Sequence, residues 1–343
     1  MFKPRNHQLL SLGALALLTS LGSNGAAWGA AFEVLPPAPP IPADNLLSPA
    51  KIKLGKELFF DPRLSINGTI SCNSCHSVQG GGVDNQQFSS GVGGAKGGRN
   101  APTVWNAAFL SVQFWDGRAR SLEEQAKGPM INPVEMGNPD HGSVVARLKN
   151  IPGYVREFSE VFGSPDTLTI DNAVRAIASY ERTLLTPNAP VDRFLLGDAS
   201  ALSPSARRGM DRVQAIGCTS CHNGPSYAGP AAAEGLGNYR KFPRVTGTEF
   251  EIKYDLATDL GRFQVTGNPS DRNMWRVPSW RNVALTAPYF HNGSVKTLDE
   301  AVRVMAKTQL GLTLEEGDVA DIVAFLEGLT GQHDVQTVPV LPF

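Results

Sequence analysis

The sequence predicts an all-α protein built from two related domains. Its 343 residues, of which 41% are hydrophobic, exceed what one small core needs and suggest two domains of ordinary size. Apolar residues recur at helical spacing in several segments, whereas strand alternation is weak. Residues 101–124 also resemble residues 277–300, which indicates that both domains follow one plan.

Helical spacing of apolar residues is clearest in residues 50–60, 170–185 and 318–329. Loops rich in glycine or proline separate the expected helices, and a proline-rich extended leader covers residues 36–42. Helix starts are indicated by Ser or Thr caps, three of them followed by a glutamate three residues later and one followed by proline. These starts are Ser121 with Glu124, Thr297 with Glu300, Thr313 with Glu316, and Ser203 with Pro204.

The domain boundaries follow from the composition along the chain. We expect a leader over residues 1–30, an N-terminal domain over residues 31–186 and a C-terminal domain over residues 187–343. The segment 186–190, TPNAP, is the best candidate for the linker between the two domains.

The leader has the order of a secretory signal peptide: a basic start, an apolar run from Leu9 to Leu21, and small residues around Ala30. A membrane anchor is the alternative, but polar and glycine residues interrupt the run, which is shorter than the ~20 apolar residues of a spanning helix. No later segment could span a membrane. The formal net charge of −1 shows no basic excess, so nucleic acid is not an expected partner.

All four cysteines lie in two C-x-x-C-H motifs, at residues 72–76 and 218–222. Disulfides or a zinc site would leave the two histidines without a role, and zinc would also have to join two distant pairs. Covalent haem uses every residue of the motif, because two thioethers attach the porphyrin and the histidine ligates the iron. The sequence therefore predicts two haem c groups, the first on Cys72, Cys75 and His76 and the second on Cys218, Cys221 and His222.

The differences between the two repeats indicate where the domains differ in function. Pro102 and Pro278 are 176 positions apart, and the same offset places Met305 opposite Pro129. A thioether above the iron closes the site and favours electron transfer, whereas proline cannot ligate. We therefore expect Met305 to complete the second haem as an electron-transfer centre and the first haem to be open and reactive. Met274 is the alternative ligand.

An open haem that reacts with peroxide needs a group that moves a proton, and a carboxylate in an apolar pocket can do this. Glu135, between Val134 and Met136, is the candidate, because burial would raise its pKa; a solvated loop glutamate is the alternative. Gln125 could hydrogen-bond the peroxide or lie on the helix surface. Trp115 could carry electrons between the haems or fill the domain junction, opposite His291 in the other repeat.

Seven runs of sequence carry a resemblance to a known family: LGKELFFDPRLS, SCNSCHS, GGRNAPTVWN, FWDGRA, EQAKGPMINPVEMG, GCTSCHNGP and RVPSWRNVALTAPYFHNGS. Over nearly the whole mature chain they closely resemble the bacterial di-haem cytochrome c peroxidase family. This resemblance implies two cytochrome c-like domains with a calcium ion at their interface. It also implies reduction of hydrogen peroxide to water, with electrons from a small periplasmic cytochrome c or a cupredoxin.

The resemblance also assigns roles to residues. Glu135 resembles the catalytic acid/base, Gln125 its pocket partner, Trp115 the residue between the haems and Met305 the ligand of the high-potential haem. A periplasmic homodimer is expected, with association at the cell surface or outer membrane left open. The calcium positions match Asn100, Thr286 and Pro288, the last two through backbone carbonyls, and hard oxygen ligands suit calcium.

One position departs from the family pattern. In much of the family the loop after the first haem reads S-x-G-H, and that histidine caps the reactive iron until the other haem is reduced. Here the stretch 89–93 has Val92 in the histidine's place, and valine cannot ligate. The sequence therefore predicts a peroxidase that needs no reductive activation, unless the loop brings in another ligand such as His141 or a serine oxygen.

Two other functions are alternatives to the peroxidase. A di-haem oxidase of the maturase type, which modifies residues on another protein, resembles this chain less because it has tyrosine where this chain has Met305. A plain di-haem electron carrier is the third reading. An open first haem beside Glu135 argues against it.

Overall fold

The computed structural model describes residue 1 and residues 31–343. The expected signal peptide, residues 1–30, therefore lies almost entirely outside the described residues. Within the part of the chain that is described, no helix combines the length and the apolar character needed to cross a membrane.

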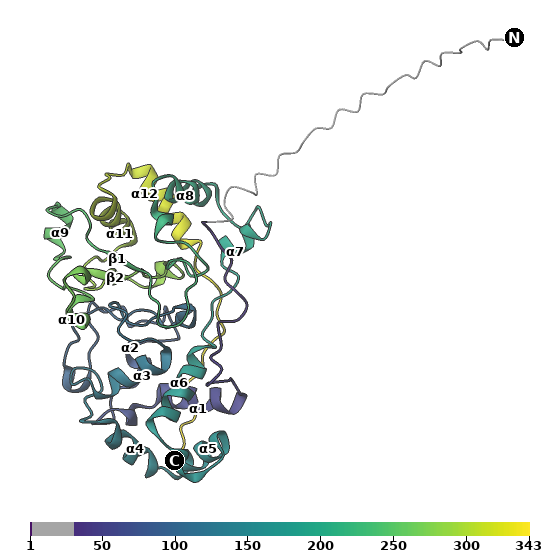
Figure 1. The fold of residues 1–343 in the computed structure, drawn as a ribbon, viewed down its shortest axis with the longest axis vertical. Coiled ribbons are helices and arrows are strands. Elements are labelled where there is room, and N and C mark those ends of the chain that lie inside the picture. The colour runs from purple at the N-terminus through teal and green to yellow at the C-terminus, as the bar shows by residue number, and fades with distance from the viewer. Residues whose placement is uncertain (2–30) are drawn as a thin grey trace.

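The all-α prediction is confirmed. The first half of the chain contains α1 to α6 and the second half contains α7 to α12, and the two groups lie one above the other along the long axis of the molecule (Figure 1). In the described residues the sheet content is one antiparallel pair of three-residue strands, in which Arg240 pairs with Trp275. The elements are α1 (Pro49–Phe60), α2 (Cys72–Cys75), α3 (Leu122–Ile131), α4 (His141–Lys149), α5 (Pro152–Phe162), α6 (Ile170–Glu181), α7 (Pro190–Leu195), α8 (Pro204–Ala215), β1 (Tyr239–Lys241), α9 (Glu249–Lys253), α10 (Phe263–Thr266), β2 (Met274–Arg276), α11 (Leu298–Met305) and α12 (Glu316–Glu327).

Each half has its own hydrophobic core. In the first half, α1 packs along α6, and Leu58 and Tyr154 are among the fully buried side chains between α1, α5 and α6. In the second half, α8 packs along α12 around Met210 and Phe325. Burying one such side chain contributes about 1.5–3 kcal/mol, so each half has the material for a core of its own.

The helix starts agree with the expected caps at three of four positions. The Ser121 hydroxyl accepts from the Glu124 N–H, and Ser203 caps α8 with Pro204 at its first position. Thr297 is the N-cap residue of α11, as expected, but its side chain makes no cap hydrogen bond among the described residues, and the Glu300 side chain accepts from the Tyr254 hydroxyl. The cap expected at Thr313 is also wrong, since α12 begins only at Glu316.

The backbone confirms the internal repeat. Asn106 and Asn282 both adopt left-handed conformations, with φ of 61° and 59°, and each precedes a single 3₁₀ turn. Phe114 and Phe290 share this conformation, with φ of 66° and 69°. Each repeat then closes a small loop with an antiparallel bridge, Gln113 with Ala119 in the first and Tyr289 with Val295 in the second.

The two repeats meet at the segment expected to be the linker. The Thr186 hydroxyl accepts from the side-chain amides of Asn106, at 2.6 Å, and of Asn282, at 2.9 Å. Thr186 is only 1% exposed. This end of the segment is therefore a buried anchor between the repeats and not an exposed spacer.

The two ends of the described chain cross between the halves. Phe32 packs in the core of the second half, edge-on to Phe325 with ring centroids 5.7 Å apart. The C-terminal end lies against the first half, beside α4 and α5 (Figure 1). There the Phe343 carbonyl accepts from the Gly153 N–H, and the Pro342 carbonyl accepts from Arg63.

Candidate functional site

The first C-x-x-C-H motif forms a single helical turn, α2. At its start, the Ser71 N–H donates to the Ser74 hydroxyl and the Ser74 N–H donates to the Ser71 carbonyl. At its end, the His76 N–H donates to the Cys72 carbonyl over 3.0 Å. Cys72 and Cys75 form no disulfide. Both sulfur atoms are therefore available for covalent attachment from a single helical turn.

The His76 imidazole is prepared to act as a neutral ligand. Its Nδ1 atom is buried and has no hydrogen-bond partner in the described part of the chain. Burial lowers the pKa of His76, with smaller opposing effects from the backbone at Pro102 and Gly82. A neutral imidazole with an unsatisfied nitrogen suits metal ligation.

The second motif repeats this geometry. The His222 N–H donates to the Cys218 carbonyl over 3.0 Å, and Cys218 and Cys221 form no disulfide. The His222 ring stacks on Trp280, with centroids 4.3 Å apart, and its Nδ1 lies 3.1 Å from the Tyr227 carbonyl. Burial lowers the pKa of His222 to about 4, so the ring is neutral and its second nitrogen is left for a metal.

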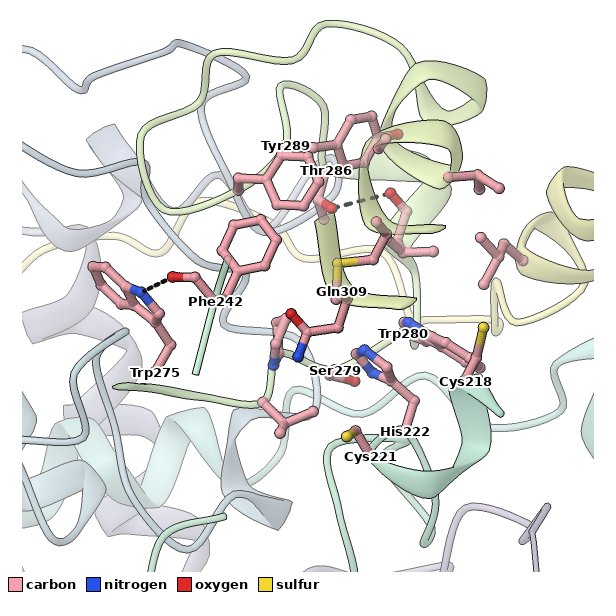
Figure 2. Close-up of a pocket in the computed structure, with 18 of the residues that line it drawn as sticks. Cys218, Cys221, His222, Phe242, Trp275, Ser279, Trp280, Thr286, Tyr289 and Gln309 are labelled. Carbon is pink, nitrogen blue, oxygen red and sulfur yellow. Dashed lines mark hydrogen bonds between the residues drawn. The ribbon is translucent and has the colours of Figure 1, made fainter. Parts of the chain in front are cut away.

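A cavity of about 240 Å³ opens beside the second motif. Figure 2 shows Cys218, Cys221 and His222 along one side of it, with Thr286 and Tyr289 on the opposite side. The cavity also reaches residues of the first half, so it lies at the junction of the two repeats.

Met305 lines this cavity, whereas Met274 is not among the described residues that line it. Met274 lies on β2, paired with Lys241. Met305 ends α11, and the chain continues as a π-helical turn, Ala306–Leu310. Such turns frequently mark functional sites. In the first half the matching residue is Pro129, inside α3, which offers no ligand.

These residues fit two covalently attached haems. The four thiols are free, both motifs present their cysteines on one turn, and both imidazoles are neutral with a nitrogen available. The cavity at the second motif has a thioether from Met305 in its wall. This donor set is that of a c-type haem with histidine and methionine ligands.

Glu135 lies on the loop after α3 and is half-buried. Its Oε1 accepts from the Asn132 side chain over 2.9 Å. Burial raises the pKa of Glu135, and Arg118 and Asn132 oppose the shift only in part. Burial also raises the pKa of the Cys72 and Cys75 thiols, and the Glu135 charge adds a smaller contribution at both.

Gln125 and Val92 lie on the two segments beside Glu135. Gln125 is half-buried on α3, and its side chain makes no hydrogen bond within the described residues. The Val92 N–H donates to the Glu135 carbonyl over 2.8 Å. The Val92 methyl groups face Gly137, where an added Cβ would come within 2.7 Å of Val92 Cγ2.

His141, considered as a substitute ligand, is engaged elsewhere. His141 is the first residue of α4, and its Nε2 lies 2.9 Å from the carbonyl oxygen of Lys127 on α3. His333 stacks on Trp105, with ring centroids 4.5 Å apart.

Trp115 lies at the junction of the repeats and lines the cavity. Its indole N–H donates to the Asn100 carbonyl over 2.9 Å. The ring meets its repeat counterpart His291 edge-on, with centroids 6.5 Å apart. His291 in turn stacks on Trp275 at 4.1 Å, and its buried Nε2 has no partner among the described residues.

The expected calcium positions, Asn100, Thr286 and Pro288, also line this cavity. The Asn100 side-chain amide donates to the Gln86 carbonyl over 2.9 Å. In the described part of the chain, no group of three or more His, Cys, Asp or Glu side chains could hold a metal ion. A calcium site here would therefore depend on amide and carbonyl oxygens.

Sequence reasoning missed two residues of the second site, Trp280 and Arg276. Trp280 supports the ring of His222, and Arg276 is buried in the cavity wall. Their counterparts at the repeat offset are Val104 and Asn100. A comparison of the repeats position by position would have shown both as differences between the two sites.

Comparisons with known proteins agree with this site. A family model described as di-haem cytochrome c peroxidase matches residues 49–200. The chain is 42% identical to a cytochrome c551 peroxidase of Nitrosomonas europaea, over 97% of this chain and 93% of that protein. It is also 42% identical to a cytochrome c551 peroxidase of Pseudomonas aeruginosa, over 98% and 96%. A crystal structure of a MauG-like protein associated with microbial copper homeostasis is similar, with a TM-score of 0.76, 29% identity, and coverage of 87% of this chain and 94% of that chain.

Proposed function

The chain belongs to the di-haem cytochrome c peroxidase family and is a di-haem peroxidase, and we propose that it reduces hydrogen peroxide without prior reductive activation. Its electrons come from a small periplasmic cytochrome c or a cupredoxin. The observation that carries the proposal is the pairing of Val92 with Glu135, because a non-ligating side chain is held next to the candidate acid/base.

The two motifs would hold the haems in different ways. Haem iron supplies the site where the oxygen–oxygen bond is reduced and where electrons are stored. His222 and Met305 would both be available to hold the second haem, whereas His76 would hold the first and Pro129, at the position matching Met305, offers no ligand. The residues that would hold them are Cys72, Cys75 and His76 for the first and Cys218, Cys221, His222 and Met305 for the second.

Glu135 would move the proton. Reduction of hydrogen peroxide to two waters consumes two protons and two electrons. One proton must pass from one peroxide oxygen to the other, which leaves as water, for the oxygen–oxygen bond to break. A carboxyl whose pKa is raised by burial holds a proton more readily than an ordinary glutamate and can return it. Asn132 fixes one carboxyl oxygen and so orients the other, while Gln125 would hydrogen-bond the peroxide.

Trp115 would lie on the electron path between the two sites. Its indole lines the cavity of the second site, while its backbone belongs to the first repeat. The hydrogen bond to the Asn100 carbonyl holds the ring in one orientation. A fixed aromatic ring at the junction suits electron delivery from the closed haem to the open one.

Three further expectations remain part of the proposal. The domains extend over residues 31–186 and 187–343 after removal of the signal peptide, residues 1–30. Calcium binds at Asn100, Thr286 and Pro288. The protein acts in the periplasm as a homodimer.

Spectroscopy and turnover of the haem-loaded protein test the function together. The fully oxidised protein should show one high-spin and one low-spin ferric haem, and should consume peroxide with a reduced cytochrome c or cupredoxin without a lag. Two low-spin ferric haems together with a lag that pre-reduction removes would contradict activation-free peroxidase function. A plain electron carrier would show no steady-state peroxide consumption.

A protein-modifying oxidase of the maturase type is the second candidate, favoured by the similarity to a MauG-like structure. Met305 at the cavity argues against it, because a thioether ligand suits electron transfer from an external donor. Oxidation of a protein substrate in place of consumption of a reduced donor would support this candidate.

A further inference from the structure

Three arginines are buried in the part of the chain that the structure describes, and two of them have a carboxylate partner. Arg182 pairs with Glu123 at 2.6 Å, and Arg281 pairs with Asp192 at 3.0 Å. Arg276 is the third. It is 5% exposed and forms no ion pair with any described residue.

Arg276 is held by backbone carbonyls alone. Its Nε donates to the Phe114 carbonyl over 3.1 Å and its Nη1 to the Val277 carbonyl over 3.2 Å. Its own N–H donates to the Trp115 carbonyl over 2.9 Å. Nη2 has no hydrogen-bond partner among the described residues, and the side chain lines the cavity that contains His222 and Met305.

The two groups that oppose the effect of burial on Arg276, Tyr239 and Asp116, have other arginine partners. The Tyr239 hydroxyl accepts from Arg262 over 2.8 Å. Asp116 pairs with Arg99 and with Arg118. Burial accordingly lowers the pKa of Arg276 to about 10, with only small opposing effects from Tyr239 and Asp116.

A buried guanidinium without a counter-charge is costly, and proteins pair such groups. The anion that pairs with the Arg276 guanidinium must therefore belong to the group that binds in the cavity. A haem attached through two thioethers keeps both of its propionates, and a carboxylate is the geometry that a guanidinium binds best.

We propose that Arg276 binds a propionate of the haem carried by Cys218 and Cys221. This inference rests on the proposed function, because it requires the second haem. Arg276 then acts as a positioning residue, since its contacts with Phe114 and Trp115 hold the carboxylate edge of that haem against the first repeat. His291, with its unpaired Nε2 in the same cavity wall, is the second donor available to the propionates.

The pairing has a consequence for the redox potential. The guanidinium neutralises the propionate charge, so its loss leaves an uncompensated negative charge beside the iron. That charge stabilises the ferric state and lowers the potential of the second haem.

The test uses the haem-loaded protein with Arg276→Gln and Arg276→Lys, and Arg240→Gln as the matched control. Arg240 also lines the cavity, but it is exposed. We expect Arg276→Gln to lower the ratio of ferrous to ferric second haem at a fixed potential at least tenfold, which is 59 mV for a one-electron couple. Arg276→Lys should lose less, and Arg240→Gln should change the ratio by less than threefold. Propionate bending modes in the resonance Raman spectrum should shift in Arg276→Gln, shift by less in Arg276→Lys, and stay unchanged in Arg240→Gln.

A potential in Arg276→Gln that matches the Arg240→Gln control, with unchanged propionate modes, would overturn the inference. If Arg276→Gln does not load haem, the lysine variant decides by the same two readouts, because it keeps the charge but not the two-pronged contact. Failure of the inference is distinct from failure of the proposed function. If only the inference about Arg276 is wrong, the protein with both haems bound still turns over peroxide. If the proposed function is wrong, it does not.

Discussion

The backbone N–H of Val92 donates a hydrogen bond to the carbonyl oxygen of Glu135 over 2.8 Å. The loop that would carry a capping histidine in much of the family is thereby fastened to the loop that carries the candidate acid/base. Gly91 makes this approach possible, because a Cβ there would lie 2.2 Å from the Val134 carbonyl oxygen. The backbone hydrogen bond joins the two loops, so a change in either would affect the proposed open side of the first haem.

Replacement of Glu135 by glutamine keeps the shape of the side chain but removes the exchangeable proton. We expect turnover with peroxide to fall by ~10²-fold or more, with both haems still attached. Steady-state kinetics and the haem spectrum measure the two quantities. Glu124→Gln, which removes an exposed carboxylate from α3, is the matched control, and equal turnover in the two variants would remove Glu135 from the mechanism.

Replacement of Val92 by histidine restores an imidazole at the position where the family cap is expected. Because the Val92–Glu135 hydrogen bond involves only backbone atoms, the loop should stay docked in the variant. We expect the oxidised spectrum to change from one high-spin haem to none, and a lag to precede turnover until the protein is pre-reduced. Electron spin resonance and stopped-flow mixing check this.

The unmodified protein is the reference for that experiment. If it already contains two low-spin ferric haems, and Val92→His leaves both spectrum and lag unchanged, the open-site interpretation is wrong. His141 is not expected to supply a cap, because its Nε2 is 2.9 Å from the Lys127 carbonyl.

Replacement of Met305 by histidine should lower the potential of the second haem, since imidazole stabilises ferric iron better than a thioether does. A shift of more than about 59 mV, a tenfold change in the ferrous-to-ferric ratio, is expected in a redox titration. Met274→His serves as the control because Met274 lies on β2 and does not line the cavity among the described residues. The opposite ranking of the two variants would transfer the ligand role to Met274.

Local sequence signals predicted much of the fold. The 176-residue offset that aligns Pro102 with Pro278 also relates the left-handed Asn106 to Asn282, since these conformations depend on few neighbours. At Thr297 the predicted helix start is correct, but the Glu300 side chain does not complete the expected capping box. Its partner Glu300 hydrogen-bonds Tyr254, which lies 46 positions away in the chain, and no local pattern contains that contact.

In the candidate site, too, features set by local sequence were predicted and features set by long-range packing were not. The helical position of Met305 favoured it over Met274, and it lines the cavity. The burial of Arg276 and the contacts of Thr186 could not be predicted from the sequence, because both result from packing between the halves. Thr186 reads as part of a linker until Asn106 and Asn282 both meet its hydroxyl, and Arg276 reads as a surface charge until its burial is known.

A last prediction concerns Glu181, at the end of α6, which is 4% exposed and whose Oε2 has no partner among the described residues. Burial raises the pKa of Glu181 to about 8, with Glu123 adding to the shift and Arg182 opposing it. Between the unfolded pKa near 4.3 and the folded value the native state holds more protons than the unfolded state, so stability falls as the pH rises through this window. The slope should approach roughly 1.4 kcal/mol per pH unit from this group alone. Glu181→Gln, compared with the exposed Glu160→Gln, should remove that slope in denaturant unfolding measured from pH 5 to 8, and parallel pH profiles for the two variants would show that Glu181 is ionised in the folded protein.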